Sequence, residues 1–417
     1  MPLAEGVSAR IVYKPHSTGV ITPSSEPVLS SDPGASGGQI LRRVSSTLSL
    51  GKDTYQSAEI RGDRQIADFR HGVRRVQGNI SGELSPLTYG DFFEAACRGT
   101  WAAAVTANQT DFMSVSADNG ASKFTFAGGN PVSKGFRVGH VIRFSDLSDA
   151  DNNATNFVIL GFGGSNSREV TVYPAPDDMT ADASYSLASI GQSLIVPSSG
   201  FVSRKFLFEI WNQDTDDARL FSECRCGGFN VQLPPTGIGT VDFDFMGRNM
   251  SIVSDGSAPF FSAPAAETTT NLLASVNGLL RVAGSTVAVI TGLNIQMQLN
   301  PSADAVVGSN LVPEIFLGRA NVTGQMTAFF EDPTLIDAFI NETEVQILAY
   351  LTGSNDDAAQ AMTFLLPRVK LGGADLQTQG EGGQAITLPF QAMKYETSVA
   401  TAGIENSTIQ ICDTQQS

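Results

Sequence analysis

Hydrophobic and polar residues alternate in a six-residue motif that occurs twice in the chain. Residues 79–84 read Asn-Ile-Ser-Gly-Glu-Leu, and residues 321–326, at an offset of 242, read Asn-Val-Thr-Gly-Gln-Met. Ile80 and Leu84 fall on one face of such a segment and the polar residues on the other, which is the period-two pattern of a half-buried strand. A repeat of this kind predicts a duplicated β unit.

A helical pattern follows each copy of the motif. Apolar residues spaced i, i+3, i+4 and i+7 run from Tyr89 to Ala96 after the first copy. After the second copy, Asp332 and Pro333 offer an N-cap and a first-turn proline for a helix that contains Ile336. One helix is therefore expected in each half.

Strand patterns complete each half. One strand pattern precedes each copy of the motif, at 44–50 and at 293–299. After each helix, a pair of strands surrounds a turn: residues 225–247 around the turn 234–237, and residues 368–393 around the turn 380–383. The order in both halves is strand, strand, helix and further strands. We expect a mainly β fold with two tandem β-sandwich or barrel domains, each with one helix.

The first half is longer than the second because of an insertion. Gly82 lies 143 residues before Arg225, whereas Gly324 lies 44 residues before Arg368. The difference locates a small β-barrel or sandwich module after the first helix, projecting from the first repeat. The predicted domains are an N-terminal arm (1–40), a discontinuous first domain (41–100 and 204–250), the inserted domain (101–203), a linker (251–270), a second domain (271–411) and a C-terminal tail (412–417).

Charge and composition narrow the function. The 417 residues carry 42 Asp and Glu against 26 Lys and Arg, a net charge of −16, so a free surface should repel nucleic acid and anionic membranes. Charged residues make up only 16%, which suits much buried or interfacial surface. No apolar run approaches the roughly 20 residues of a membrane span. With no signal-peptide layout and four scattered cysteines, we expect a reduced, soluble protein made in a cytoplasm.

Motifs for catalysis or metal binding are weak. The three histidines, His16, His71 and His140, lie apart in the sequence. Residues 34–38 match the letters of a nucleophile elbow without the strand and helix it needs, and residues 149–153 resemble the start of a calcium loop but lack its later glycine and glutamate. No enzyme activity, cofactor or metal site is predicted, although an opportunistic calcium site at 149–153 stays open.

Residues 52–75 concentrate charge in a chain that is otherwise poor in it. Two interpretations are open. The segment is either a solvated loop or a mixed-sign surface that meets another subunit, where ion pairs set the register of contact.

Several segments together resemble a known family. They are residues 64–72 (Arg-Gln-Ile-Ala-Asp-Phe-Arg-His-Gly), the motif at 79–84, residues 318–324, 330–332 and 341–344, and the segments 365–369 and 388–392. The sequence resembles the major tail tube proteins of long-tailed, siphovirus-like bacteriophages, in the form that has a duplicated tube domain. The resemblance covers about residues 40–100 and 204–411 and says little about the insertion.

The resemblance implies a structural virion protein. Subunits would form rings, the rings would stack into a tube, and DNA would pass through without tight binding during ejection into the host. Two similar units in each of three chains would give a trimeric ring with pseudo-sixfold symmetry. The implied partners are other copies of the chain and the tape-measure, tail-tip and tail-terminator proteins. The implied location is the phage tail, assembled in the host cytoplasm, with the inserted domain outside the tube and exposed to the host surface.

Candidate site residues follow from this role. Asp242 and Asp244 alternate with phenylalanines and are candidates to face the lumen, although Thr387 and Pro389 at the matching positions of the second copy fit an ordinary solvated strand equally well. The candidate ring-stacking residues are Lys52, Asp53, Arg61, Asp63, Arg64, Asp68 and Arg70.

Two other classes of protein remain as alternatives. A β-rich adhesin or spike protein would share the composition and strand pattern without polymerising. A carbohydrate-active enzyme would need two carboxylates in one cleft, for which Asp216, Asp217 and Glu223 are the only available group we find.

Overall fold

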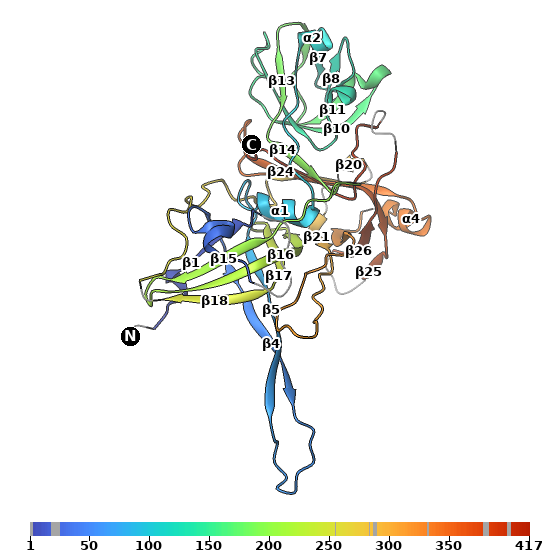
Figure 1. The fold of residues 1–417 in the computed structure, drawn as a ribbon. Coiled ribbons are helices and arrows are strands. Elements are labelled where there is room, and N and C mark those ends of the chain that lie inside the picture. The colour runs from blue at the N-terminus through green and yellow to red at the C-terminus, as the bar shows by residue number, and fades with distance from the viewer. Residues whose placement is uncertain are drawn as a thin grey trace.

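The computed structural model describes residues 3–17, 26–254, 256–282, 284–286, 290–331, 333–377, 383–397 and 402–417. Within these residues the strands form two antiparallel sheets, one of 19 strands and one of eight, with few and short helices (Figure 1). The mainly β fold class predicted from the sequence is confirmed.

A run of antiparallel strands shared by both halves forms the middle of the larger sheet, and we call it the central sheet. Its order is β4 (Ser49–Gln56, with β3, Ser45–Ser46), β5 (Phe69–Glu83), β17 (Thr240–Gly247), β16 (Asp217–Leu233), β21 (Ile290–Gln298), β22 (Asn321–Phe329), β26 (Ala385–Ala392) and then β24 (Ala361–Leu371) and β25 (Asp375–Gln377). In the order of strands across the sheet, β16 is the last strand of the first repeat and β21 is the first strand of the second. The β16·β21 pair therefore joins the two repeats.

Cross-strand pairing shows which positions of the repeats correspond. Asn230 faces Asp242 on β16 and β17, and Asp375 faces Thr387 on β25 and β26, which gives an offset of 145 for these strands. Val76 faces Gly247 and Val322 faces Ala392. The offset between β5 and β22 is therefore 246.

The offset of 242 predicted for the motif is thus wrong by four residues. The strand carries glycine at both 78 and 82 and apolar residues at 76, 80 and 84. A shift of four preserves this pattern, so the motif fits equally well in two registers and only pairing with β17 distinguishes them.

Helix α1 (Gly90–Cys97) covers the buried face of the central sheet. Its Phe92 and Phe93 rings lie 5.4 and 5.1 Å from Phe243, and Phe93 lies 6.1 Å from Phe364 of the second repeat. The helix therefore packs against both halves. In the second half α4 spans Thr334–Ile340, while the predicted cap Asp332 and the turn residues 380–382 lie outside the described residues.

Strands also lie in the three segments predicted as N-terminal arm, linker and C-terminal tail. Strand β1 (Ala9–Pro15) of the predicted N-terminal arm pairs with β15 (Phe206–Asn212). Strand β18 (Asn249–Ser254), at the start of the predicted linker, pairs with β16. Strand β27 (Gln410–Asp413), at the predicted tail, pairs with β14 (Gln192–Ile195) and β24. β1 and β27 carry apolar residues buried by strands far away in the sequence, such as Ile11 and Ile411. The remaining elements are β2 (Gln39–Ile40), β19 (Gly278–Val282), β20 (Ser285–Thr286), β23 (Val345–Thr352), η1 (Gly6–Ser8) and η2 (Ser30–Gly34).

Residues 106–189 form the eight-stranded sheet, which we call the inserted module. Its strands are β6 (Thr106–Asn108), β7 (Val115–Asp118), β8 (Lys123–Phe126), β9 (Val141–Ser145), β10 (Phe157–Gly163), β11 (Glu169–Tyr173), β12 (Met179–Asp182) and β13 (Ser186–Ser189), with the short helices α2 (Gln109–Phe112), α3 (Pro131–Lys134) and η3 (Ser165–Ser167). The module has its own aromatic core.

The inserted module docks on the second repeat. Val138, Val141 and Val158 share a buried cluster with residues of β23 and β24. Thr363 Oγ1 donates to the Gly139 carbonyl at 2.8 Å, and Asn156 Nδ2 donates to the Ala359 carbonyl at 2.7 Å. The module leaves the chain in the first repeat but rests on the second, which the chain order did not reveal.

Candidate functional site

The outward face of the central sheet is polar across both repeats, and we call it the polar face. One row of directly paired residues crosses six strands. In order, it comprises Ser81, Asp242, Asn230, Gln296, Thr323 and Gln391. The opposite face holds the apolar residues between them, such as Ile80, Phe243 and Val231, all fully buried.

Neutral amide and hydroxyl side chains make up most of the polar face. Its residues are Ser45, Thr47, Asn79, Ser81, Glu83, Asn230, Gln232, Thr240, Asp242, Asp244, Asn294, Gln296, Gln298, Asn321, Thr323, Gln325, Thr327, Asp375, Thr387, Pro389 and Gln391. Four are acidic and none is Lys or Arg. Two cations lie at the margin of this face, Arg225 of β16 and Lys370 of β24, which pairs directly with Gln391. They form ion pairs with Glu314 at 2.9 Å and with Glu342 at 3.4 Å.

Hydrogen bonds between side chains hold several of these amides in place. Asn294 Nδ2 donates to Asn230 Oδ1 at 2.7 Å across the joint between the repeats. Gln391 Nε2 donates to Asn321 Oδ1 at 3.0 Å. A neutral amide releases no counterions from a polyanion, so such a face gives phosphates little to bind.

Asp242 and Asp244 both lie on the polar face. Asp244 is exposed and Asp242 half-buried, while Phe243 and Phe245 are buried beneath them. Partial burial, and then repulsion from Asp242, raise the pKa of Asp244 above its ordinary value. The structure thus brings the two predicted lumen-facing residues together among amides.

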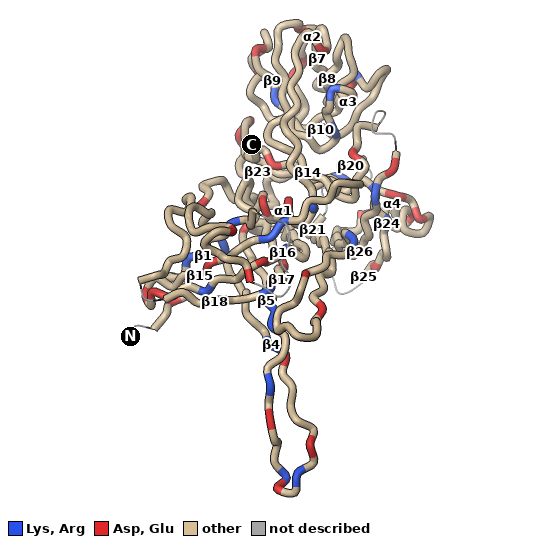
Figure 2. Tube along the Cα trace, in the orientation of Figure 1, with Lys and Arg blue, Asp and Glu red and all other residues tan. Residues whose placement is uncertain are grey.

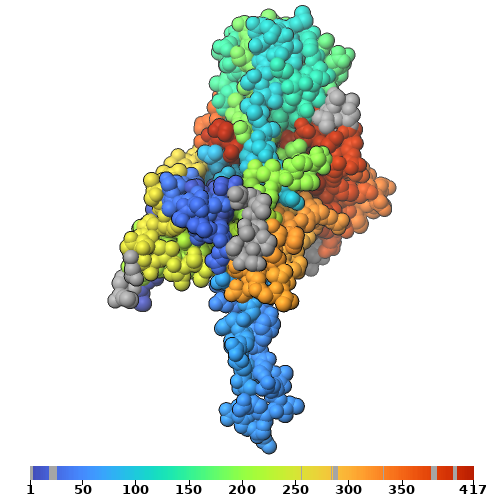
Figure 3. Space-filling model, in the orientation of Figure 1, coloured from blue at the N-terminus to red at the C-terminus, as the bar shows by residue number. Residues whose placement is uncertain are grey.

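Residues 52–75 form most of a β hairpin that projects from the body of the protein, and we call it the arm. Lys52 pairs with Arg74 and Gln56 with Phe69, with the tip at 57–68. Figures 1 and 3 show the arm extending beyond the end of the central sheet, on the side away from the inserted module. The sequence interpretation as a loop misses this pairing because charges obscure the strand pattern.

All seven predicted stacking residues lie on the arm, and most charged residues there have partners on the arm itself (Figure 2). The ion pairs are Arg61 with Asp63 at 3.1 Å, Arg70 with Asp68 at 2.7 Å and Arg75 with Asp53 at 3.1 Å. Residues 52–75 hold six basic and four acidic side chains, so the arm is net positive in a chain of net charge −16.

The arm also exposes large apolar side chains, which the sequence analysis missed. Ile60 is fully exposed, and Tyr55, Ile66 and Phe69 are each about half exposed or more. A cluster of apolar side chains on an extended hairpin is typical of a contact surface for another protein.

Glu223 lies apart from Asp216 and Asp217, the other two carboxylates considered for an enzyme. Glu223 is buried between Lys205 and Arg248, with both N–O distances 2.9 Å. Asp217 accepts from Asn212 at the other end of β16, six residues away or about 20 Å along a strand. That separation exceeds the roughly 9.5 Å limit for paired glycosidase carboxylates.

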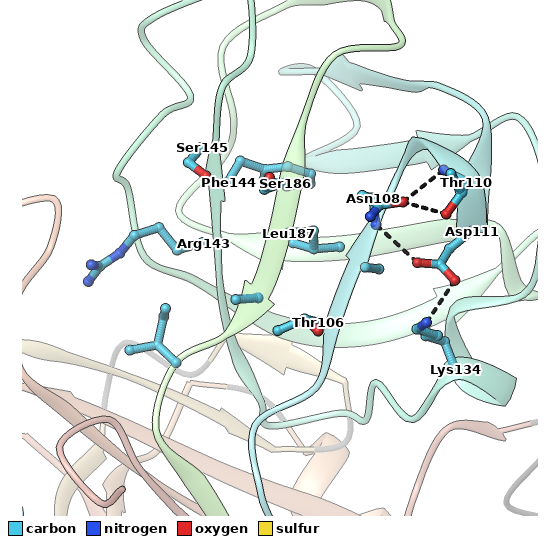
Figure 4. Close-up of a pocket in the computed structure, with 13 residues that line it drawn as sticks. Thr106, Asn108, Thr110, Asp111, Lys134, Arg143, Phe144, Ser145, Ser186 and Leu187 are labelled. Carbon is cyan, nitrogen blue, oxygen red and sulfur yellow. Dashed lines mark hydrogen bonds and ion pairs between the residues drawn. The ribbon is translucent and has the colours of Figure 1, made fainter.

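The inserted module has a shallow groove beside β6, β9 and β13 (Figure 4). Asp111 bridges Lys134 at 2.7 Å and caps the backbone at Asn108 at 3.1 Å, so these polar groups are satisfied within the module. The calcium-like turn is held by Asn153, which accepts from the Leu147 backbone. Among the described residues, no group of three or more His, Cys, Asp or Glu side chains could hold a metal ion.

In the part of the chain that the structure describes, no helix has the length and apolar character needed to cross a membrane. The duplicated sheet, its continuous polar face and the exposed arm define a structural β protein. A family model described as phage tail tube protein matches residues 6–392. The chain therefore belongs to the phage tail tube protein family, and the predicted resemblance is confirmed. No curated protein matches the sequence.

Proposed function

We propose that copies of this chain form rings, three chains to a ring with pseudo-sixfold symmetry, and that the rings stack into the tail tube through which DNA is ejected. The observation that carries the proposal is the continuous polar face. It crosses both repeats without interruption, and its row of six paired residues contains no Lys or Arg.

The charge of this face suits a conduit for DNA. Basic side chains would bind phosphates and release counterions, which holds DNA in place. Neutral amides with a few carboxylates, including Asp242 and Asp244, offer hydration without such binding. In this proposal the polar face lines the lumen and the buried face is covered by α1.

The arm is proposed as the contact between stacked rings. It extends past the end of the central sheet, carries a net positive charge and exposes Ile60 and Ile66. The acidic remainder of a neighbouring copy is electrostatically complementary to it. Lys52, Asp53, Arg61, Asp63, Arg64, Asp68 and Arg70 are the proposed stacking residues.

The inserted module is proposed to lie outside the tube, where it is exposed to the host surface. It docks on β23 and β24, away from the polar face. The tape-measure, tail-tip and tail-terminator proteins are the further proposed partners, met in the host cytoplasm during assembly.

Negative-stain electron microscopy with mass photometry tests the proposal on the purified full-length chain. We expect rings with the mass of three chains, and tubes with a central channel on concentration. A particle that stays monomeric at every concentration, even after tail-tip complexes are added, would contradict it and favour the adhesin-type alternative.

A further inference from the structure

The inserted module and the body of the protein meet at an interface that we call the seam, between residues 137–141 of the module and strands β24 and β27. Gln410 Nε2 of β27 donates to the Val138 carbonyl at 2.9 Å. Thr363 Oγ1 of β24 donates to the Gly139 carbonyl at 2.8 Å. Figure 1 shows the module standing above these strands. Residues 137–141 therefore contact both strands of the body.

One histidine, His140, is buried in the seam. The residue is 7% exposed, and neither of its imidazole nitrogens has a hydrogen-bond partner among the described residues. The ring lines a small cavity together with residues 189–193, at the connection from β13 to β14, and Cys412 of β27. No Asp or Glu side chain lines this cavity. A neutral imidazole is tolerated there, whereas an imidazolium needs an acceptor for each of its two N–H groups.

The charged groups near His140 would not compensate a positive charge on it. Arg137 lies on the same segment, and its Nε donates to Glu405 Oε1 at 2.6 Å across the seam. Asp413 of β27 follows the residue that lines the cavity and so points to the opposite face of the strand. There its carboxylate accepts from the Leu87 N–H at 2.6 Å. An imidazolium would therefore be repelled by Arg137 without gaining a carboxylate partner.

The other elements at the seam carry no charge that could replace such a partner. Residues 157–160 of β10, 189–193 and 361–366 of β24 contain no titratable side chain. Burial raises the pKa of the Cys412 thiol to about 11, which keeps it neutral. The seam as a whole is thus built around an uncharged His140.

Burial, and then repulsion from Arg137, lower the pKa of His140 from its ordinary 6.5 to about 3. An undocked module would expose the ring to water and return its pKa to about 6.5. Docking is therefore at full strength above about pH 6.5 and weakens as the pH falls from there towards 3.

The module can leave the seam without unfolding. It has an aromatic core of its own, and the chain enters it before β6 and leaves it after β13. Below these two connections, β14 is held by β27, and Ser193 of β14 also bridges to Ala102. Release of the module thus leaves the pairing of the body intact.

We propose that the inserted module is released by acid: protonation of His140 frees it from β24 and β27 as a folded unit that stays tethered to the first repeat. The inference concerns a single chain and does not depend on the ring assembly proposed above.

Thiol labelling of Cys412 in the purified full-length chain tests the proposal. Cys412 is 3% exposed and lines the cavity, so it should react only when the module leaves. The probe is a pyridyl disulfide, which reacts with thiols in acid as well as at neutral pH, and its rate on the unfolded chain at each pH is the reference. Labelling that follows the undocked population should rise about 25-fold between pH 7 and pH 5, given the two pKa values of His140.

Matched variants assign the effect to His140. His140→Gln and, as a second variant that does not titrate, His140→Leu should label Cys412 equally at both pH values. His71→Gln, on the exposed arm, should keep the full rise. Cys97, buried in α1, should stay unlabelled at both pH values because the body remains folded.

Asp413 also titrates in this range, but with the opposite sign. Burial raises its pKa to about 6, so acid removes a buried charge there and stabilises β27. It therefore cannot produce release in acid.

Three results would overturn the proposal. They are an unchanged Cys412 rate in the natural chain at pH 5, an equal rise in the His140 variants, and labelling of Cys97 in step with Cys412, which would indicate unfolding of the whole chain.

Discussion

Two connections at the same place in the repeats adopt opposite structures. In the first repeat this connection is the arm, residues 52–75, which includes the adjoining ends of β4 and β5 and leaves the body of the protein. In the second repeat the link between β21 and β22, residues 299–320, folds back beside the base of the arm (Figure 1, orange), and we call it the base loop. Position in the repeat and length therefore do not decide whether such a connection projects from the protein or folds back against it.

The base loop is held by apolar burial and by arginines of the first repeat. Val312 and Ile315 are fully buried in a cluster with Val73. Arg248 Nε donates to the Val312 carbonyl and Arg225 Nη1 to the Ile315 carbonyl, both at 2.7 Å. Val312 and Ile315 thus find partners within the chain, whereas Val307 and Phe316 of the same loop are exposed.

Beyond its base at Val73, the arm has no such buried apolar partners among the described residues. Ile60 and Ile66 are exposed, and the ion pairs on the arm are solvent-exposed contacts worth at most about 1 kcal/mol each. The comparison indicates that the base loop stabilises the fold, whereas the arm serves a contact between copies.

Removing the arm tip should have the largest effect on assembly. We expect replacement of residues 57–68 by Asn-Gly, which favours a two-residue hairpin turn, to abolish tubes while leaving rings intact. Microscopy and mass photometry check this. Unchanged thermal unfolding of the variant serves as the control, and tubes of normal length would contradict a stacking role for the arm.

Breaking the buried ion cluster should have the largest effect on the fold. Glu223→Gln leaves Lys205 and Arg248 without their shared carboxylate, and Arg248 also anchors the base loop. We expect a loss of about 3–5 kcal/mol in the free energy of unfolding, measured by chemical denaturation. Glu342→Gln, at an exposed pair with Lys370, should lower the free energy of unfolding by under about 1 kcal/mol. Equal losses in the two variants would contradict a larger contribution from the buried ion cluster.

A matched pair of truncations compares the two connections directly. Val312→Ala removes buried methyl groups and should destabilise the chain by about 2 kcal/mol, whereas Ile60→Ala should leave its stability unchanged. Once rings have formed, we expect Ile60→Ala to impair their stacking into tubes more than Val312→Ala does, because Ile60 lies on the arm. Destabilisation of the isolated chain by Ile60→Ala would show that the arm packs on its own body.

Charge reversal on the arm should have the smallest effect. Arg64→Glu or Arg70→Glu is expected to shorten tubes several-fold at low salt and less at high salt, because exposed ionic contacts are screened. Tube lengths in micrographs at two ionic strengths measure this. Lys123→Glu, on the inserted module, is the matched control; tubes of normal length from both arm variants would remove these arginines from the interface.

The sequence predicts the elements better than their partners. Alternation along β17 predicts that Phe243 and Phe245 are buried beneath Asp242 and Asp244, because the period of a strand is local. Pairing register is not local, and the near-equivalent glycines 78 and 82 left the repeat offset ambiguous by four residues. The same limit applies to β1, whose partner β15 lies about two hundred residues away.

For the candidate site as well, the sequence predicts local features but not tertiary contacts. Charge density at 52–75 identifies a distinctive surface, but not the hairpin, because the strand pattern there is interrupted by charged residues. The polar face could not be predicted as a whole, since its six-strand row is assembled from separate segments of both repeats. Docking of the inserted module on β23 and β24 is likewise a tertiary contact without a local signal.

Electron cryomicroscopy of assembled tubes, at a resolution that separates strands, tests the central claim most directly. The account predicts that Asn230, Asp242 and Gln296 face the tube axis. A map with the polar face on the outer surface would contradict it.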